Sequence, residues 1–164
     1  MTWRHATRRT LASCVTFEDK LLLNAPASEV WDLLLDVNRF AACMPGVEQV
    51  TQIDDHTFDG VMTARVGPMS GKFAFRAKIL ESDPPRELAA QVEGTDSVTK
   101  SKLTADMGMT LTPQGEHQTE LAHRATVEMH GRLAILGDMV MRATASLLIE
   151  EFGKRLRQQL EAAK

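Results

Sequence analysis

The run TFDGVMTARVGPMSGKFAFRAKILES, residues 57–82, decides the fold. Apolar and polar residues alternate along both of its halves, which is the pattern of a strand with one buried face. Gly67 and Pro68 interrupt the alternation, and this pair is typical of a turn. The connection is too short for a helical crossover, so the two halves are predicted to pair as an antiparallel hairpin.

The same alternation predicts strands on both sides of this hairpin, separated by short runs rich in Asp, Pro and Gly. Together with 57–66 and 71–82, the predicted strands cover residues 16–23, 47–53, 86–95, 100–113 and 119–131. Short connections between successive strands favour antiparallel pairing over parallel units.

Helical patterns appear in two places. After the first strand, Pro26, Ser28 and Glu29 supply helix-start chemistry, and Asp36 ends this helix and caps a second short one, which Pro45 and Gly46 stop. After Gly131 the chain is predicted to be helical to its end, with an apolar stripe at steps of three to five residues: Leu133, Leu136, Val140, Ala143, Leu147, Phe152, Leu156 and Leu160. The predicted fold class is α+β, a curved seven-stranded antiparallel sheet wrapped around a long C-terminal helix.

Composition narrows the class of protein. The 164 residues predict one domain, residues 15–164, after a disordered tail, residues 1–14. The net charge of −3 argues against a nucleic-acid-binding protein, and no apolar stretch is long enough to cross a membrane. Cys14 and Cys43 form no metal or disulfide pattern, and two unpaired thiols fit a cytoplasmic location.

The alternation also predicts which side chains face the helix. The inward set is Phe58, Gly60, Met62, Ala64, Val66, Phe73, Phe75, Ala77, Ile79, Leu103, Ala105, Met107, Met109, Leu111, Leu121, His123, Ala125, Val127 and Met129. Because protein interiors pack at a density of about 0.75, this many small residues indicates either a cavity or a solid core in which small residues face large ones. Both interpretations stay open at this point.

The sequence offers little catalytic chemistry. No pair of histidines has metal-ligand spacing and no glycine-rich phosphate loop occurs, so we predict no catalytic residue, no metal and no cofactor. Cys43 is interpreted as a structural thiol rather than a nucleophile, which would need a base and an orienting third group. His123 is either a core histidine with one buried hydrogen bond or a polar anchor for a ligand.

Several motifs together point to a known family. They are Ala25-Pro26 with Val30-Trp31, the segment Cys43 to Glu48 around Pro45-Gly46, Val66-Gly67-Pro68 with Gly71, the turn Asp83 to Arg86, and Gly131 before the last helix. Over residues 16–160 the chain resembles the carbon monoxide dehydrogenase G-subunit family, which belongs to the START and birch-pollen-allergen-like (SRPBCC) superfamily.

The resemblance implies a helix-grip fold around a hydrophobic cavity. It also implies a non-catalytic accessory protein of a molybdenum hydroxylase of the carbon monoxide dehydrogenase type. Such a protein would bind a quinone- or lipid-like ligand and link the enzyme to the inner membrane face as a peripheral protein.

On this basis we predict a ligand site from the inward side chains and the helices. Its wall consists of Phe58, Met62, Phe73, Phe75, Met107, Met109, His123, Met139 and Ala143, and its lid of Phe40, Met44 and Pro45. Methionines suit such a wall because their side chains adapt to the shape of a ligand. Two alternatives remain: a small cyclase or hydrolase of the same fold that uses His123 with a carboxylate, and an assembly chaperone for the hydroxylase.

Overall fold

The computed structural model describes residues 12–162. It contains one antiparallel sheet with the strand order β1-β7-β6-β5-β4-β3-β2. The strands are β1 (Ala12–Leu23), β2 (Val47–Asp54), β3 (Thr57–Val66), β4 (Met69–Asp83), β5 (Glu87–Asp96), β6 (Lys102–Gly115) and β7 (Gln118–His130). The helices are α2 (Ala27–Leu35), α3 (Val37–Cys43), the 3₁₀ turn η1 (Arg132–Leu136) and α4 (Gly137–Ala162).

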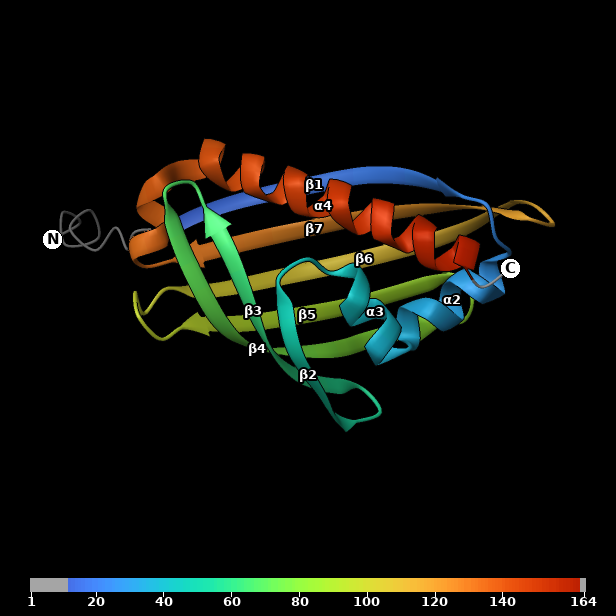
Figure 1. Ribbon diagram of the computed structural model, residues 1–164, viewed down its shortest axis with the longest axis horizontal. Coiled ribbons are helices and arrows are strands. Elements are labelled where there is room, and N and C mark those ends of the chain that lie inside the picture. The colour runs from blue at the N-terminus through green and yellow to red at the C-terminus, as the bar shows by residue number, and fades with distance from the viewer. Residues whose placement is uncertain (1–11, 163–164) are drawn as a thin grey trace, which may run out of the picture.

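The sheet curves around α4, and α2 and α3 lie together at one end of the curved face (Figure 1). This arrangement confirms the predicted fold class, including the hairpin that residues 57–82 form as β3 and β4. The predicted cap is also present, because the Asp36 carboxylate accepts hydrogen bonds from the backbone N–H groups of Asn38 and Arg39 at 3.1 and 3.2 Å.

Two boundaries differ from the sequence expectation. Ala12, Ser13 and Cys14, predicted to lie in a disordered tail, belong to β1, where Ala12 pairs with His130 of β7; the rest of that tail lies outside the described residues. The helical stretch after Gly131 is interrupted, because η1 gives way to α4 at Gly137, whose φ is +83°. The two pieces therefore do not share one helical phase.

The change of phase alters which side of the long helix is buried. The buried residues of α4 are Met141, Phe152, Gly153, Leu156 and Leu160. At 100° per residue, Met139 and Ala143 lie about 160° around the helix from Met141, so they face solvent. Leu147 is 68 % exposed as well, so the predicted apolar stripe is wrong over its middle third.

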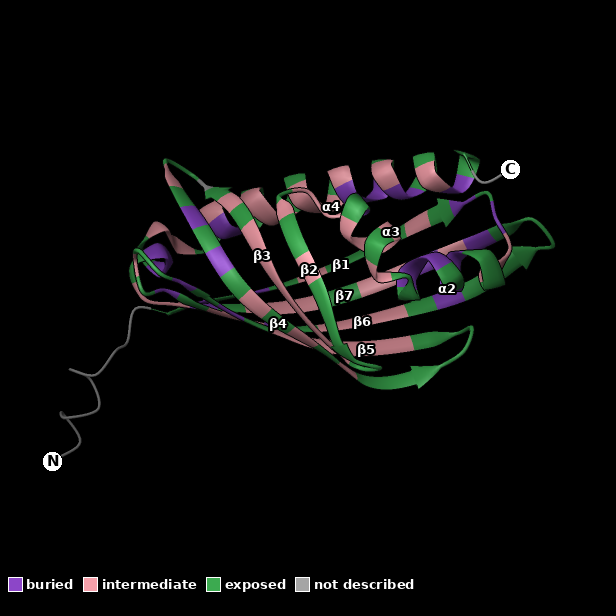
Figure 2. Cartoon of the chain, turned by 60° about the horizontal axis from the view of Figure 1, so that its bottom comes forward, coloured by how far each residue is buried: buried purple, intermediate pink, exposed green. Residues whose placement is uncertain are grey.

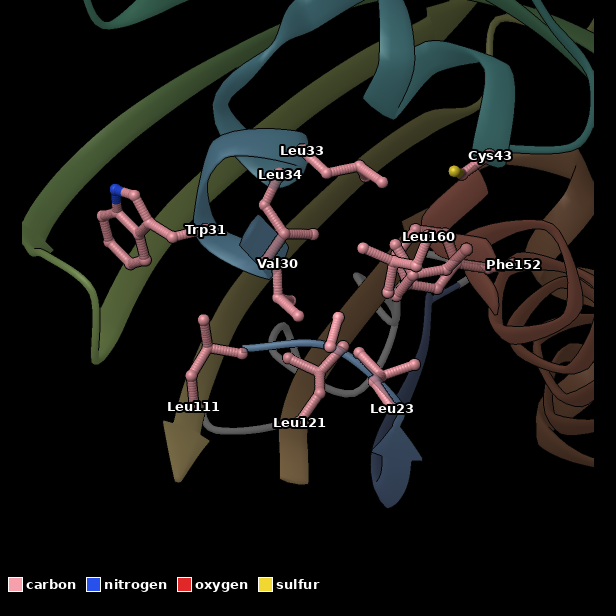
Figure 3. Close-up of a cluster of buried hydrophobic side chains, with 12 residues drawn as sticks. Leu23, Val30, Trp31, Leu33, Leu34, Cys43, Leu111, Leu121, Phe152 and Leu160 are labelled. Carbon is pink, nitrogen blue, oxygen red and sulfur yellow. The ribbon is translucent and has the colours of Figure 1, made fainter. Parts of the chain in front are cut away.

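Two clusters of buried side chains hold α4 to the sheet. The first core cluster joins α2, α3, the end of α4 and the adjacent ends of β1, β6 and β7, as Figure 3 shows; its members include Leu23, Val30, Trp31, Leu33, Cys43, Leu111, Leu121, Phe152 and Leu156. The second core cluster lies at the opposite end and consists of Val15, Phe73, Met129, Leu133, Ala134 and Met141.

A hydrogen-bonded turn fixes η1 beside the second core cluster. The carboxylate of Asp96, 1 % exposed, accepts from the backbone N–H of Lys72 and from the N–H and hydroxyl of Thr99. Ser101 in the same turn accepts from the backbone N–H of Leu133 at 3.0 Å. A Cβ on Gly131 would lie 2.9 Å from the Ser101 Cα, so only glycine allows this close approach. The turn between β5 and β6 thus sets where α4 starts.

Candidate ligand-binding site

The strand register brings the predicted inward residues onto one face of the sheet, the face that carries α4; we call it the inner face. Across β6, β7 and β1, for example, Met109 pairs with His123 and His123 with Asp19. Across β3, β4 and β5, Gly60 pairs with Phe75 and Phe75 with Gly94. Cross-strand partners point to the same side, so the predicted alternation had the correct phase.

The inner face is filled at its ends and only half-buried between them. We call the half-buried part the inner-face middle: Phe58, Met62, Phe75, Ala77, Ile79, Ala90, Val92, Met107, His123 and Ala125. In Figure 2 the central stretches of these strands are largely of intermediate burial, whereas buried segments lie toward the ends. The inner-face middle is therefore an apolar surface that the protein's own side chains do not cover completely.

The packing of α4 contributes to this difference. Between Met141 and Phe152, no residue of α4 is buried. Ala145 and Leu148 lie on the same helical face as these two residues, but both are only half-buried. Helix α4 thus contacts the sheet closely at both ends and leaves its central turns less closely packed.

Some of the small inward residues serve the protein's own packing. A Cβ on Gly60 would lie 2.5 Å from Cζ of Phe75, and one on Gly71 would lie 2.7 Å from Cε2 of Phe73. The two aromatic rings occupy the space above these glycines. Small residues on the inner face therefore do not all indicate a cavity, and the part left open is the half-buried middle.

The predicted site residues fall into three groups. Phe58, Met62, Phe75, Met107, Met109 and His123 are half-buried on the inner face. Phe73 is 5 % exposed within the second core cluster, and Phe40 and Met44 pack against the first, with the Phe40 and Phe152 rings 5.7 Å apart. Met139, 85 % exposed, and Ala143 lie on the solvent side of α4 and do not join the site.

Cys43 lies inside the first core cluster with no exposed surface. Its burial raises the pKa of the thiol, and the positive charges of Arg39 and Arg155 offset this only in part. A thiol that stays protonated is a poor nucleophile. The geometry supports the structural interpretation of this cysteine.

His123 is the polar side chain of the inner-face middle. Desolvation lowers its pKa, and the charge of Asp19 opposes this shift. No hydrogen bond among the described residues 12–162 involves its imidazole, which does not support the first of the two interpretations, a core histidine held by one buried hydrogen bond. Asp19 was missed by the sequence analysis, although its alternation with Phe17 and Leu21 places it on the same face.

A cleft of about 550 Å³ lies between β1 and α4 and reaches His123 from the side. Its lining includes Phe17, Asp19 and His123 from the sheet and Ser146, Ile149 and Glu150 from the helix. His123 therefore borders both the apolar inner-face middle and a polar lateral opening.

The outer face of the sheet has a different character. Cross-strand ion pairs cover it, among them Arg124–Glu18 at 3.3 Å and Arg76–Asp59 at 2.7 Å. A broad depression of about 940 Å³ lies over Gly108 and Ala122, with charged residues such as Lys20 around it. Its small floor residues and charged rim suit water better than an apolar molecule.

Residues 12–162 offer no support for two further classes of site. No group of three or more His, Cys, Asp or Glu side chains gathers there in a way that would bind a metal ion. Nor does any described helix combine the length and apolarity needed to cross a bilayer.

The sequence matches the family model of the carbon monoxide dehydrogenase G subunit (CoxG) over residues 20–161. The chain belongs to the CoxG family. No curated protein matches it at the sequence level.

Solved structures agree on the fold. A conserved protein from Geobacillus kaustophilus superposes with a TM-score of 0.84 at 21 % identity, covering 91 % of this chain and 97 % of that one. A START superfamily protein from Mycobacterium smegmatis gives 0.68 at 12 % identity, with 91 % and 99 % covered. The ZhuI aromatase/cyclase from Streptomyces sp. R1128 gives 0.64 at 14 % identity, with 90 % and 94 % covered. At these identities the likeness establishes the START-like fold of this CoxG family member and no more.

Proposed function

We propose that this CoxG family protein is a non-catalytic carrier that binds a quinone- or lipid-like molecule on the inner-face middle, beneath α4. The observation that carries the proposal is the half-buried apolar surface between two fully buried core clusters. Every 100 Å² of apolar ligand surface removed from water there contributes about 2.5 kcal/mol. Met62 and Met107 adapt the wall to the shape of the ligand.

The family supplies the proposed partner. Because of its family, we propose that this protein is an accessory protein of a molybdenum hydroxylase of the carbon monoxide dehydrogenase type. In this role it would contact the inner face of the membrane as a peripheral protein. Phe40 and Met44 close the α3 end of the site in this proposal, because both pack against the first core cluster.

The second candidate is a small cyclase or hydrolase, favoured by His123 and Asp19 lying side by side on the inner face and by the ZhuI-like fold. General acid–base work needs a positioned proton carrier, and Asp19 forms no hydrogen bond to His123. A buried, protonated Cys43 offers no nucleophile either. The carrier is therefore the function that we put forward.

Mass spectrometry of an organic extract tests the proposal, with protein purified in the absence of detergent and compared with Phe75→Asp. A quinone or prenyl lipid that co-purifies only with the parent supports the carrier. A co-purifying hydroxylase in the absence of any extracted ligand would instead support the assembly chaperone. Turnover of a small ester or polyketide-like substrate that is lost in His123→Ala would support the enzyme.

A further inference from the structure

The opening between β1 and α4 has defined ends. The Arg142 guanidinium donates to the backbone carbonyl of Thr16 at 3.4 Å and lies 6.0 Å from the centre of the Phe17 ring. At the other end Arg157 donates to the backbone carbonyl of Leu22 at 3.4 Å, and a Cβ on Gly153 would lie 3.4 Å from Cδ2 of Leu21. The five-residue step from Thr16 to Leu21 on β1 and the eleven-residue step from Arg142 to Gly153 on α4 both span about 17 Å. The two elements thus run side by side over this length, bridged at each end and open between.

Two carboxylates inside this window can accept hydrogen bonds. Asp19 accepts from the backbone N–H of Lys20 at 2.8 Å through Oδ1, and no other hydrogen bond among residues 12–162 uses its carboxylate. Glu150 on the facing side of α4 is a second carboxylate. Ionised carboxylates only accept, so a molecule that hydrogen-bonds to Asp19 or Glu150 must donate.

His123 supplies the complementary group. It lies next to Asp19 across the β1–β7 pair and next to Met109 across the β6–β7 pair, so it stands where the polar window meets the apolar inner face. Burial lowers the pKa of His123, which favours the neutral imidazole near pH 7, with one nitrogen that donates and one that accepts. A single hydroxyl group can accept from His123 and donate to Asp19 at the same time.

We propose that the window between β1 and α4 binds the head group of an amphiphile, and that this head is an alcoholic or phenolic hydroxyl that donates to Asp19 and accepts from His123. The inference rests on the proposed function, because the apolar tail would lie on the inner-face middle. Anionic heads are disfavoured by Asp19 and Glu150, and the arginines at the rim, Arg142 and Arg157, are already directed to backbone carbonyls of β1.

The test uses two probes with the same tail, para-hexylphenol and its methyl ether, para-hexylanisole. Binding to the parent is expected to be tighter for the phenol by about tenfold or more, the effect of one hydrogen bond to a charged acceptor. Asp19→Asn is expected to bring the two affinities within about threefold, since an amide is a weaker acceptor. Glu120→Gln, a control carboxylate that pairs with Lys20 on the outer face, is expected to keep the preference.

The outcomes separate the two claims. If neither probe binds the parent, the proposed apolar site itself is wrong. If both probes bind equally well, the site stands and the hydroxyl head group is wrong. If the preference survives Asp19→Asn or is lost in Glu120→Gln, the assignment of the anchor to Asp19 is overturned.

Discussion

The ends of the inner face and its middle are built from the same strands but differ in what covers them. Leu121 of β7 has no exposed surface, whereas His123 and Ala125, two and four residues farther along one face, are half-buried. Both ends carry a buried core cluster, whereas α4 has no buried residue between Met141 and Phe152. The ends of the sheet thus provide most of the buried core that stabilises the fold, and the middle provides the surface proposed to bind a ligand.

The largest expected effect comes from truncating the filled end. Leu156→Ala should lower the free energy of unfolding by about 3 kcal/mol, because Leu156 is fully buried and the cavity cannot collapse easily. Met107→Ala, in the half-buried middle, should cost about 1 kcal/mol or less. Urea unfolding measures both; equal losses would mean that the middle is packed core.

The other filled end depends on a buried carboxylate, Asp96. The hydrogen bond from the Thr99 hydroxyl is the largest cause that lowers the pKa of Asp96 below the usual value of 3.8, and backbone N–H groups add to it. Its stabilisation is therefore present above pH 3.8 and lost as the pH falls through the lowered value. Asp96→Asn should cost about 2 kcal/mol near neutral pH.

The check is the melting temperature of parent and variant between neutral and acidic pH. The difference between the two proteins should shrink as the solution is acidified below the ordinary Asp range. Parallel curves would show that Asp96 does not hold the β5–β6 turn by its charge.

Adding volume at one buried and one half-buried position of the inner face sharpens the comparison. Ala105, 7 % exposed, and Ala125, half-buried, lie on the inner faces of adjacent strands. Ala105→Leu should overpack and cost about 1–2 kcal/mol, whereas Ala125→Leu should change stability by less than about 0.5 kcal/mol. Thermal unfolding compares the pair, and a clear loss in Ala125→Leu would contradict an unfilled middle.

The smallest effect concerns His123. Burial lowers the pKa of His123 in the folded protein. As the pH falls below 6.5, this imidazole is therefore protonated in the unfolded chain before it is protonated in the folded protein. Stability therefore decreases below that pH, and His123→Gln should remove this part of the dependence. An NMR titration of the imidazole protons together with melting curves tests it; a titration midpoint above 6.5 would reverse the predicted sign.

Much of the fold could be predicted from the sequence because the strands alternate cleanly. The alternation of apolar and polar residues along 57–82 indicated which side chains face inward. Asp36 identified the junction of α2 and α3. The phase of α4 could not be read in the same way. The sequence from Leu133 to Leu147 looks like one apolar stripe, but the turn at Gly137 separates it into two helices with different phases.

The site was predictable only in part for the same reason. Phe58, Phe75, Met107 and His123 follow from strand alternation, and the strand register puts them on one face. Met139 and Ala143 were assigned from the helix stripe and lie outside the site. Local pattern also cannot show that the Phe75 ring fills the space above Gly60, because this contact depends on pairing between two strands.

The most direct test of the carrier is a titration with a short-chain quinol, such as decyl-ubiquinone kept in its reduced form, followed by quenching of tryptophan fluorescence. The matched variants are Phe75→Asp, which places a charge on the inner-face middle, and Ala74→Asp, which places the same charge on the exposed outer face one residue away. Circular dichroism verifies that both are folded. We expect binding to the parent and to Ala74→Asp with similar affinity, and binding weaker by at least about tenfold in Phe75→Asp. Equal affinity in all three proteins would contradict a ligand site on the inner-face middle.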